Sequence, residues 1–301
     1  RYGLRPKGVS RFMFVTRPVG KGRLQKAFLI LIQDLEDKII ARTPADVQRF
    51  EFNKKHFLPS LRTPVGRGKM DITILHDYVA KEPYEQMDKI MGLCGFKGKL
   101  QANYWEYVRT EFNRSKARIA IIRRINPFSP NQNLIAFYSD VPLILANVFH
   151  IVAEENCEQG KAITTLLNSV FFLAYFFNLR EETTGRYTEV RHYDLYEMRL
   201  YPTDKQIENL VNVYEKYRDK EFPALREQLD MYFEERYKWF WATEKGQQAL
   251  EPPPIEPHSL RLEFDMDVIR AVGANLTRDD ILNAYKAMVW DMIITRGLRR
   301  D

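Results

Sequence analysis

The chain has 301 residues, of which 45% are hydrophobic and 29% are charged, a composition typical of an ordinary globular, soluble protein. This length suffices for one large domain or two modest ones with a packed core. The two cysteines, Cys94 and Cys157, lie 63 positions apart and lack the spacing of a metal site. We therefore predict unpaired thiols in a reducing compartment, the cytoplasm. Nothing before Lys26 has the pattern of a signal peptide.

The formal net charge of +6 hides an asymmetry along the chain. Residues 1–125 carry 26 Lys and Arg against 12 Asp and Glu, a balance of +14, whereas residues 126–301 carry 20 against 28, a balance of −8. This distribution predicts that a polyanion contacts the first part of the chain. A plain solvated basic surface is the alternative explanation of the same charges.

Basic residues are interleaved with predicted strands and turns at the start of the chain. Residues 12–16 predict a strand, and residues 27–32 predict a buried strand or short helix. The Gly-Lys-Gly turn at 20–22 lacks the glycine spacing and the Lys-Ser/Thr pair of a phosphate-binding loop, so a basic loop on a DNA backbone is favoured. Candidates for backbone contact are Arg17, Lys21 and Arg23.

The next part of the chain combines apolar segments with basic ones. FLPSLR at 57–62 precedes the polar loop TPVGRGK at 63–69, and residues 71–75 predict a strand. YWEYVR at 104–109 and the segment RIAIIRRI at 118–125, rich in Ile and Arg, follow.

The stretch from Lys161 to Pro202 organises the rest of the chain. Residues 162–179 carry no charge, and their apolar side chains recur at helical spacing, which predicts one buried helix. Because five of these 18 residues are polar and the run is at the short limit for a bilayer, we expect a core helix and no membrane span. A polar loop with Gly185 follows, and residues 187–200 predict a strand-like end.

The pattern becomes helical from residue 204 onward. Apolar residues recur at helical spacing over 204–250, until three prolines at 252–254 interrupt the pattern as a linker. Residues 277–295 predict a final helix, with Thr277 as its N-cap and acidic residues in its first turn.

Four segments of the chain occur in the order found in one family. They are LLNS at 166–169 with the aromatic helix, basic loop and Tyr-Pro ending that follow it, the segment 57–69, the segment 104–125, and RLEFDMDVIRAVG at 261–273. Together they resemble the target-recognition (specificity) region that follows the catalytic domain in adenine-specific DNA methyltransferases of type I and type IIG restriction–modification systems. The chain begins at Arg1 rather than Met, so we interpret it as a C-terminal fragment of a longer protein.

The resemblance implies an α+β fold, in which a mixed α/β target-recognition domain at residues 1–203 precedes a helical C-terminal region at residues 204–301. It also implies a helix at 104–109 before a strand at 118–125 that leads into the sheet. It implies that the module binds double-stranded DNA for a restriction–modification or phage-defence system. The helical region would be a spacer or a docking surface for a restriction or specificity subunit. S-adenosylmethionine is expected in the missing catalytic domain, and no cofactor or metal is expected in this fragment.

The sequence lacks a recognisable motif for methyl transfer. INPFSP at 125–130 lacks the second proline of the Asn/Asp-Pro-Pro-Tyr/Phe loop that holds a flipped adenine, and we predict a turn between strands there. The five histidines are scattered, and His150 lies in an apolar run that predicts a core position. No nuclease or hydrolase motif has its required spacing, so we expect the fragment itself to be non-catalytic.

Loops that combine basic and polar side chains with glycine are the best candidates for reading DNA, because Lys and Arg neutralise phosphates while polar groups reach base edges. The candidate DNA-binding residues are Arg17, Lys21, Arg23, Arg62, Arg67, Lys69, Thr184, Arg186, Tyr187 and Arg191. Two other functions fit the same sequence. One is a helical protein–protein interaction module without DNA binding, and the other is a self-contained hydrolase or nuclease.

Overall fold

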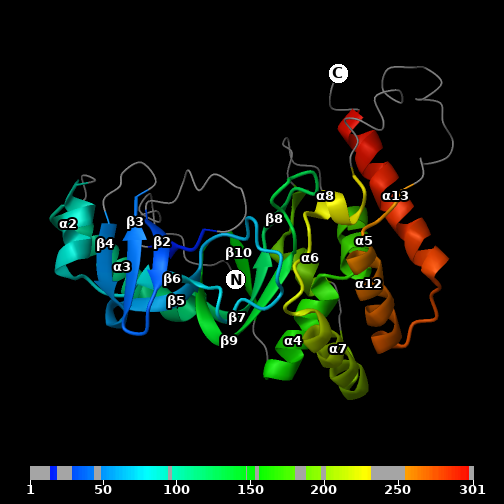
Figure 1. Cartoon of the computed structure of the whole chain (residues 1–301), viewed down its shortest axis with the longest axis horizontal. Coiled ribbons are helices and arrows are strands. Elements are labelled where there is room, and N and C mark those ends of the chain that lie inside the picture. Colours follow the sequence, from blue (N-terminus) through cyan, green and yellow to red (C-terminus); the bar gives the residue numbers. More distant parts are fainter. Residues whose placement is uncertain are drawn as a thin grey trace. The chain divides into compact units, whose positions relative to one another are not determined.

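The computed structural model describes residues 14–18, 29–43, 49–93, 97–146, 148–152, 156–179, 188–197, 201–231 and 255–297 (Figure 1). Contacts between Cα atoms divide the chain into two compact units. The first comprises Arg1–Gly66, Asp71–Arg123 and Phe137–Glu155, and the second comprises Arg67–Met70, Arg124–Ala136 and Asn156–Asp301. These two units are defined by the contacts between Cα atoms. The predicted boundary at residue 203 instead separates a DNA-binding domain from a helical region, and it stays a prediction.

The first unit is built on a nine-stranded mixed sheet with the strand order β10-β7-β9-β5-β6-β1-β2-β3-β4. In chain order the strands are β1 (Phe14–Thr16), β2 (Leu29–Asp34), β3 (Lys38–Arg42), β4 (Arg49–Asn53), β5 (Phe57–Leu61), β6 (Asp77–Ala80), β7 (Lys116–Ile122), β9 (Ala136–Leu145) and β10 (Phe149–Val152). Short 3-10 turns occupy Lys54–His56 and Asn113–Ser115. A mixed sheet with helices confirms the predicted α+β class.

Four strands of this sheet, β1, β2, β5 and β9, run in the same direction, as does β4 at its edge, since β3 is antiparallel to both β2 and β4. β1 is parallel to β2, and β5 is parallel to β9. β6 is antiparallel to both β1 and β5, which makes β1 and β5 parallel to each other. The carboxyl ends of these four strands therefore point toward one edge of the sheet, the side on which open parallel sheets bind their ligands.

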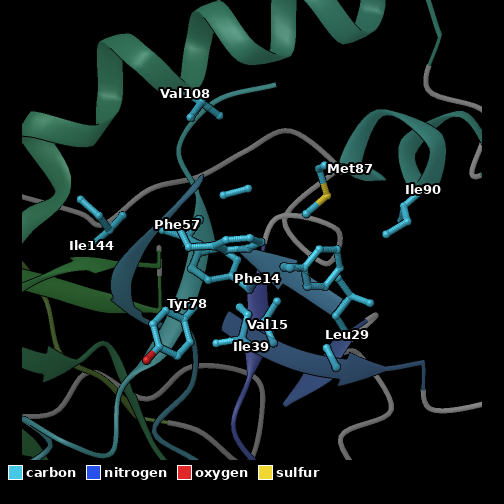
Figure 2. Close-up of a cluster of buried hydrophobic side chains, with 14 of the residues drawn as sticks. Phe14, Val15, Leu29, Ile39, Phe57, Tyr78, Met87, Ile90, Val108 and Ile144 are labelled. Carbon is cyan, nitrogen blue, oxygen red and sulfur yellow. The ribbon is translucent and has the colours of Figure 1, made fainter. Parts of the chain in front are cut away.

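The sheet packs against two helices, α2 (Glu85–Leu93) and α3 (Lys99–Phe112), through one hydrophobic cluster. In Figure 2, Met87 and Ile90 of α2 and Val108 of α3 lie around aromatic and aliphatic side chains of the strands. Met87 and Ile90 are three positions apart, so one face of α2 supplies both. Burial of each such side chain stabilises the fold by about 1.5–3 kcal/mol.

Several predicted elements of the first unit are confirmed. β1, β2 and β7 lie where strands were predicted, although residues 12, 13, 27 and 28 lie outside the described part of the chain. The strand predicted at 118–125 ends at Ile122, and Arg124–Ile125 pair in a separate two-stranded sheet. The helix predicted at 104–109 is part of α3. His150 is 1% exposed in β10, as its apolar surroundings predicted.

The second unit is mainly helical. Its described elements are α4 (Cys157–Leu167), α5 (Val170–Leu179), α6 (His192–Glu197), α7 (Asp204–Tyr217), α8 (Leu225–Gln228), α12 (Ser259–Val272), α13 (Arg278–Gly297) and the paired strands β8 (Arg124–Ile125) and β11 (Thr188–Glu189). α13 confirms the predicted final helix, and the hydroxyl of Thr277 accepts the Asp280 N–H (3.2 Å) as its cap. Cys157 is a free thiol, whereas Cys94 and residues 232–254 lie outside the described residues.

The predicted turn at 125–130 is also confirmed. The Ser129 N–H donates to the Asn126 carbonyl (3.0 Å), and the Phe128 N–H donates to the Asn126 side chain (3.2 Å). An Asn side chain that accepts a hydrogen bond from two residues further on is a common turn device, so this segment is structural.

The apolar stretch at 162–179 forms two helices and not the single helix predicted. α4 and α5 are separated by Asn168 and Ser169 and are bent by 58°. Asn168 Oδ1 accepts the N–H groups of Ile135 (2.8 Å) and Ala136 (3.1 Å), and Nδ2 donates to the Ala136 carbonyl (2.8 Å). This side chain thereby ties the break to a distant segment. Among the described residues, no single helix is long and apolar enough to cross a bilayer, although α4 and α5 together pass that test.

A buried ion pair satisfies the helix ends that this break creates. Arg261 of α12 donates to both carboxylate oxygens of Asp265 (2.8 and 3.0 Å), and the two side chains are 1% and 0% exposed. Arg261 also donates to the Asn168 carbonyl after α4 (2.6 Å), while Asp265 accepts the Val170 N–H at the start of α5 (2.8 Å) and the hydroxyl of Tyr285. A cation thus meets a helix C-terminus and an anion meets a helix N-terminus, as the helix dipole favours.

The charges of this pair support each other. Burial raises the pKa of Asp265. Burial would lower the pKa of Arg261, but the Asp265 carboxylate outweighs it and raises that pKa. Each charge therefore depends on the other, since either one alone would be desolvated without compensation.

Residues 71–75 do not form the predicted strand. Asp71 makes an isolated bridge with Tyr138, and its carboxylate accepts the Thr73 N–H (2.8 Å), which closes a turn. The strand begins later, at Asp77. The apolar residues suggested a strand, but the local hydrogen bond of Asp71 competes with strand pairing.

Residues 187–200 are also not a strand over their length. Of these, the described residues are 188–197; within them Thr188–Glu189 pairs as a strand and His192–Glu197 forms α6. The Asp194 carboxylate accepts the Arg191 N–H (2.8 Å) and satisfies a backbone group at the start of this helix.

Replacing Asp265 with Ala is expected to destabilise the protein by about 3–5 kcal/mol, because the buried Arg261 loses its counter-charge and the Val170 N–H loses its acceptor. Glu263→Ala, two positions earlier on α12 and exposed, is the matched control and should cost less than about 0.5 kcal/mol. Urea unfolding measures both. Equal effects of the two substitutions would contradict the assignment.

Candidate nucleic-acid interface

The structure brings two of the predicted DNA-binding residues, Arg17 and Arg62, to one carboxylate. Asp77, at the start of β6, is fully buried and accepts the Arg17 N–H at Oδ1 (2.8 Å) and the Arg62 N–H at Oδ2 (2.9 Å). The two arginines directly follow β1 and β5, the parallel strands on either side of β6. Asp77 therefore fixes where both strands end.

The side chains of these two arginines have different partners. Arg62 donates from Nη1 to the hydroxyl of Thr16 (3.2 Å), and burial lowers its pKa despite the nearby Asp77 carboxylate. Arg17 donates from Nη2 to Asp34 (2.7 Å). Because this bond is a short, charge-assisted one, the protein itself neutralises much of the Arg17 charge.

Asp34 also accepts hydrogen bonds from two further polar side chains. Its carboxylate accepts from the Lys54 ammonium (2.6 Å) and from the Tyr78 hydroxyl (2.8 and 2.9 Å), which Figure 2 shows directed away from the hydrophobic cluster. Burial would raise the pKa of Asp34, but the hydrogen bonds from Lys54 and Tyr78 outweigh it and lower the pKa. Burial, and then Asp34, raise the pKa of the Tyr78 phenol. Asp34 is thus an ionised internal counter-charge at neutral pH.

The residues around Asp77 bind and position other groups in the fold. Both oxygens of Asp77 accept backbone N–H groups, so this carboxylate has a structural role. Burial lowers the pKa of His76, so its imidazole is neutral at pH 7, and Nδ1 lies 2.7 Å from the Thr73 carbonyl oxygen. The described part of the chain holds no group of three or more His, Cys, Asp or Glu that could bind a metal ion.

The predicted DNA-reading loop at 63–69 is partly packed into the protein. Arg67 is 3% exposed, and Lys69 is half-buried. The Phe222 N–H donates to the Gly68 carbonyl (2.9 Å), and a Cβ at position 68 would lie 2.6 Å from the Phe222 carbonyl oxygen. Gly68 therefore permits a close backbone approach. Contact of the buried Arg67 with DNA stays a prediction.

The remaining candidates divide between described and undescribed residues. Arg191 is half-buried and directly precedes α6. The predicted contacts Lys21, Arg23, Thr184, Arg186 and Tyr187 lie outside the described residues. Among the described candidates, the structure thus brings Arg17 and Arg62 of the first unit to one carboxylate.

Sequence reasoning missed the two groups that position Arg62, namely Thr16 and Asp77. Both are 0% exposed. The signal for Asp77 is a carboxylate that opens a short apolar run, because a buried charge needs hydrogen-bond donors. Thr16 carries no comparable signal, since threonine is common in strands.

Comparison of the chain with protein-family models, curated proteins and solved structures gave no match.

Replacing Asp77 with Ala is expected to destabilise the protein by about 2–4 kcal/mol, because two buried N–H groups lose their acceptor. The exposed Asp37→Ala is the matched control and should change stability by less than about 0.5 kcal/mol. Thermal unfolding followed by circular dichroism compares them. If the two variants unfold at the same temperature, Asp77 does not hold the strand ends as described.

Proposed function

We propose that this chain is the DNA-sequence recognition module of an adenine-specific DNA methyltransferase from a restriction–modification or phage-defence system. The module selects and grips a site on double-stranded DNA in the cytoplasm. A separate catalytic domain of the parent protein transfers the methyl group from S-adenosylmethionine, so the module itself performs no chemical step.

The observation that most supports this proposal is the basic excess of residues 1–125, which carry 26 Lys and Arg against 12 Asp and Glu. Duplex DNA presents one negative charge per about 1.7 Å of its axis, and neutralising those charges supplies most of the non-specific affinity. The same residues build most of the nine-stranded sheet, including all four strands at its β1–β4 end. A rigid sheet with a basic balance is suited to gripping a duplex.

Contacts to DNA phosphates carry no sequence information. Sequence recognition requires side chains that reach the base edges in the grooves. The loop between α5 and β11 carries Thr184, Arg186 and Tyr187, side chains that can bond base edges. These residues lie between α5 and β11, the strand that pairs with β8.

The second unit suits a protein partner better than a polyanion. Residues 126–301 carry an excess of eight acidic side chains, which disfavours contact with phosphates. Its long helices, α7, α12 and α13, expose charged faces that suit docking of a restriction or specificity subunit.

Fluorescence anisotropy of a labelled duplex tests this function. We expect binding at 50 mM salt, and log K should fall linearly with log salt concentration as counterions are released. Lys205→Gln, an exposed substitution on α7 of the second unit, is the control and should leave binding unchanged. Failure to bind at 50 mM salt would overturn the proposal. A nuclease-insensitive protein complex without DNA would favour the interaction module instead.

A further inference from the structure

The register of the strands places a line of residues on one face of the sheet. Thr16 of β1 pairs with Ile30 of β2, Ile30 pairs with Arg42 of β3, and Arg42 pairs with Arg49 of β4. Because residues in register on adjacent strands point to the same side, these four side chains share a face. Arg62 joins them, since its guanidinium donates to the Thr16 hydroxyl (3.2 Å). We name Arg62, Arg42 and Arg49 the arginine row.

The opposite face of the same strands is apolar. Ile39 and Phe52 pair on it and are 0% exposed in the hydrophobic cluster. Asp34, which pairs with Ile39, also lies on that side and neutralises Arg17. The arginine row therefore occupies the side of the sheet that lacks this internal counter-charge.

Arg42 and Arg49 form a like-charged pair directly across two strands. Both side chains are exposed, and neither guanidinium makes a hydrogen bond or ion pair with any described residue. Like charges at opposed positions destabilise a sheet. Lys38, at the other end of β3 on the same face, instead bonds Glu51 of β4 (2.9 Å). The hairpin thus neutralises one of its cations internally and leaves two adjacent ones without a carboxylate among the described residues.

We propose that the arginine row binds the phosphate backbone of duplex DNA, an inference that rests on the function proposed above. Guanidinium groups match phosphate oxygens in a planar, two-bond geometry and remain charged at all relevant pH values. Strands lie about 4.8 Å apart, so the row from β1 to β4 spans about 14 Å. Successive phosphates of one DNA strand advance about 3.4 Å along the axis, so the row reaches several of them.

A phosphate between Arg42 and Arg49 also explains why the pair persists in the fold. The bound anion offsets the repulsion that the free protein bears. The row should therefore affect stability and binding in opposite directions: loss of one arginine relieves repulsion in the free protein and weakens the complex.

The variants Arg42→Gln, Arg49→Gln and the double variant test the row, with Lys38→Gln as the matched control on the same face. We expect the slope of log K against log salt to become shallower by about 0.9 for each arginine removed, equally for duplexes of different sequence, and to stay unchanged in the control. The unfolding midpoint of each single arginine variant should rise by about 1 °C without DNA.

The outcomes separate this inference from the function it rests on. If the wild-type chain binds duplex and the double variant keeps the wild-type slope, the row is not a phosphate contact, although the proposed function stands. If the variants lose affinity for one sequence only, the arginines read bases and the inference is overturned. If the wild-type chain does not bind duplex at all, both proposals fail.

Discussion

Every backbone N–H and C=O group that folding buries needs a hydrogen-bond partner, and here buried charged side chains meet that need at the ends of strands and helices. In the second unit, Arg261 and Asp265 bond the carbonyl after α4 and the N–H that opens α5. In the first unit, Asp77 accepts the N–H groups that follow β1 and β5. Because an unpaired buried charge is costly, these contacts hold the helix break and the strand ends in place.

This constraint connects the fold to the proposed function. Asp77 ends β1 and β5 side by side across β6, so that the side chain of Arg62 reaches Thr16. From Thr16 the strand register continues to Arg42 and Arg49. A buried anion thus positions the half-buried Arg62, while Arg42 and Arg49 are exposed and a second anion, Asp34, neutralises Arg17.

Most elements could be predicted from the sequence because their signals are local. Strands such as β7 show apolar runs, and the N-cap Thr277 precedes its helix directly. The break at Asn168 could not be predicted, because its partners Ile135 and Ala136 lie 33 and 32 positions away. The turn at Asp71 was missed because its apolar neighbours outweighed one side-chain hydrogen bond in the pattern.

The candidate site was predictable in its residue types and not in its assembly. Arg17 and Arg62 were predicted singly, but their shared carboxylate is 60 and 15 positions away, respectively. Arg67 was predicted to face DNA because its loop contains glycines, whereas Gly68 packs against Phe222. Arg42 and Arg49 carry no motif, and only strand register makes them neighbours.

Photo-cross-linking tests most directly whether the basic first unit is the part that meets DNA. The chain is bound to a duplex that contains bromouracil, irradiated and digested, and the cross-linked peptides are identified by mass spectrometry. We expect cross-links in the first unit, on peptides that contain Arg42, Arg49 or Arg62, and in the loop before β11. Cross-links confined to residues 204–297 would contradict this placement of the duplex.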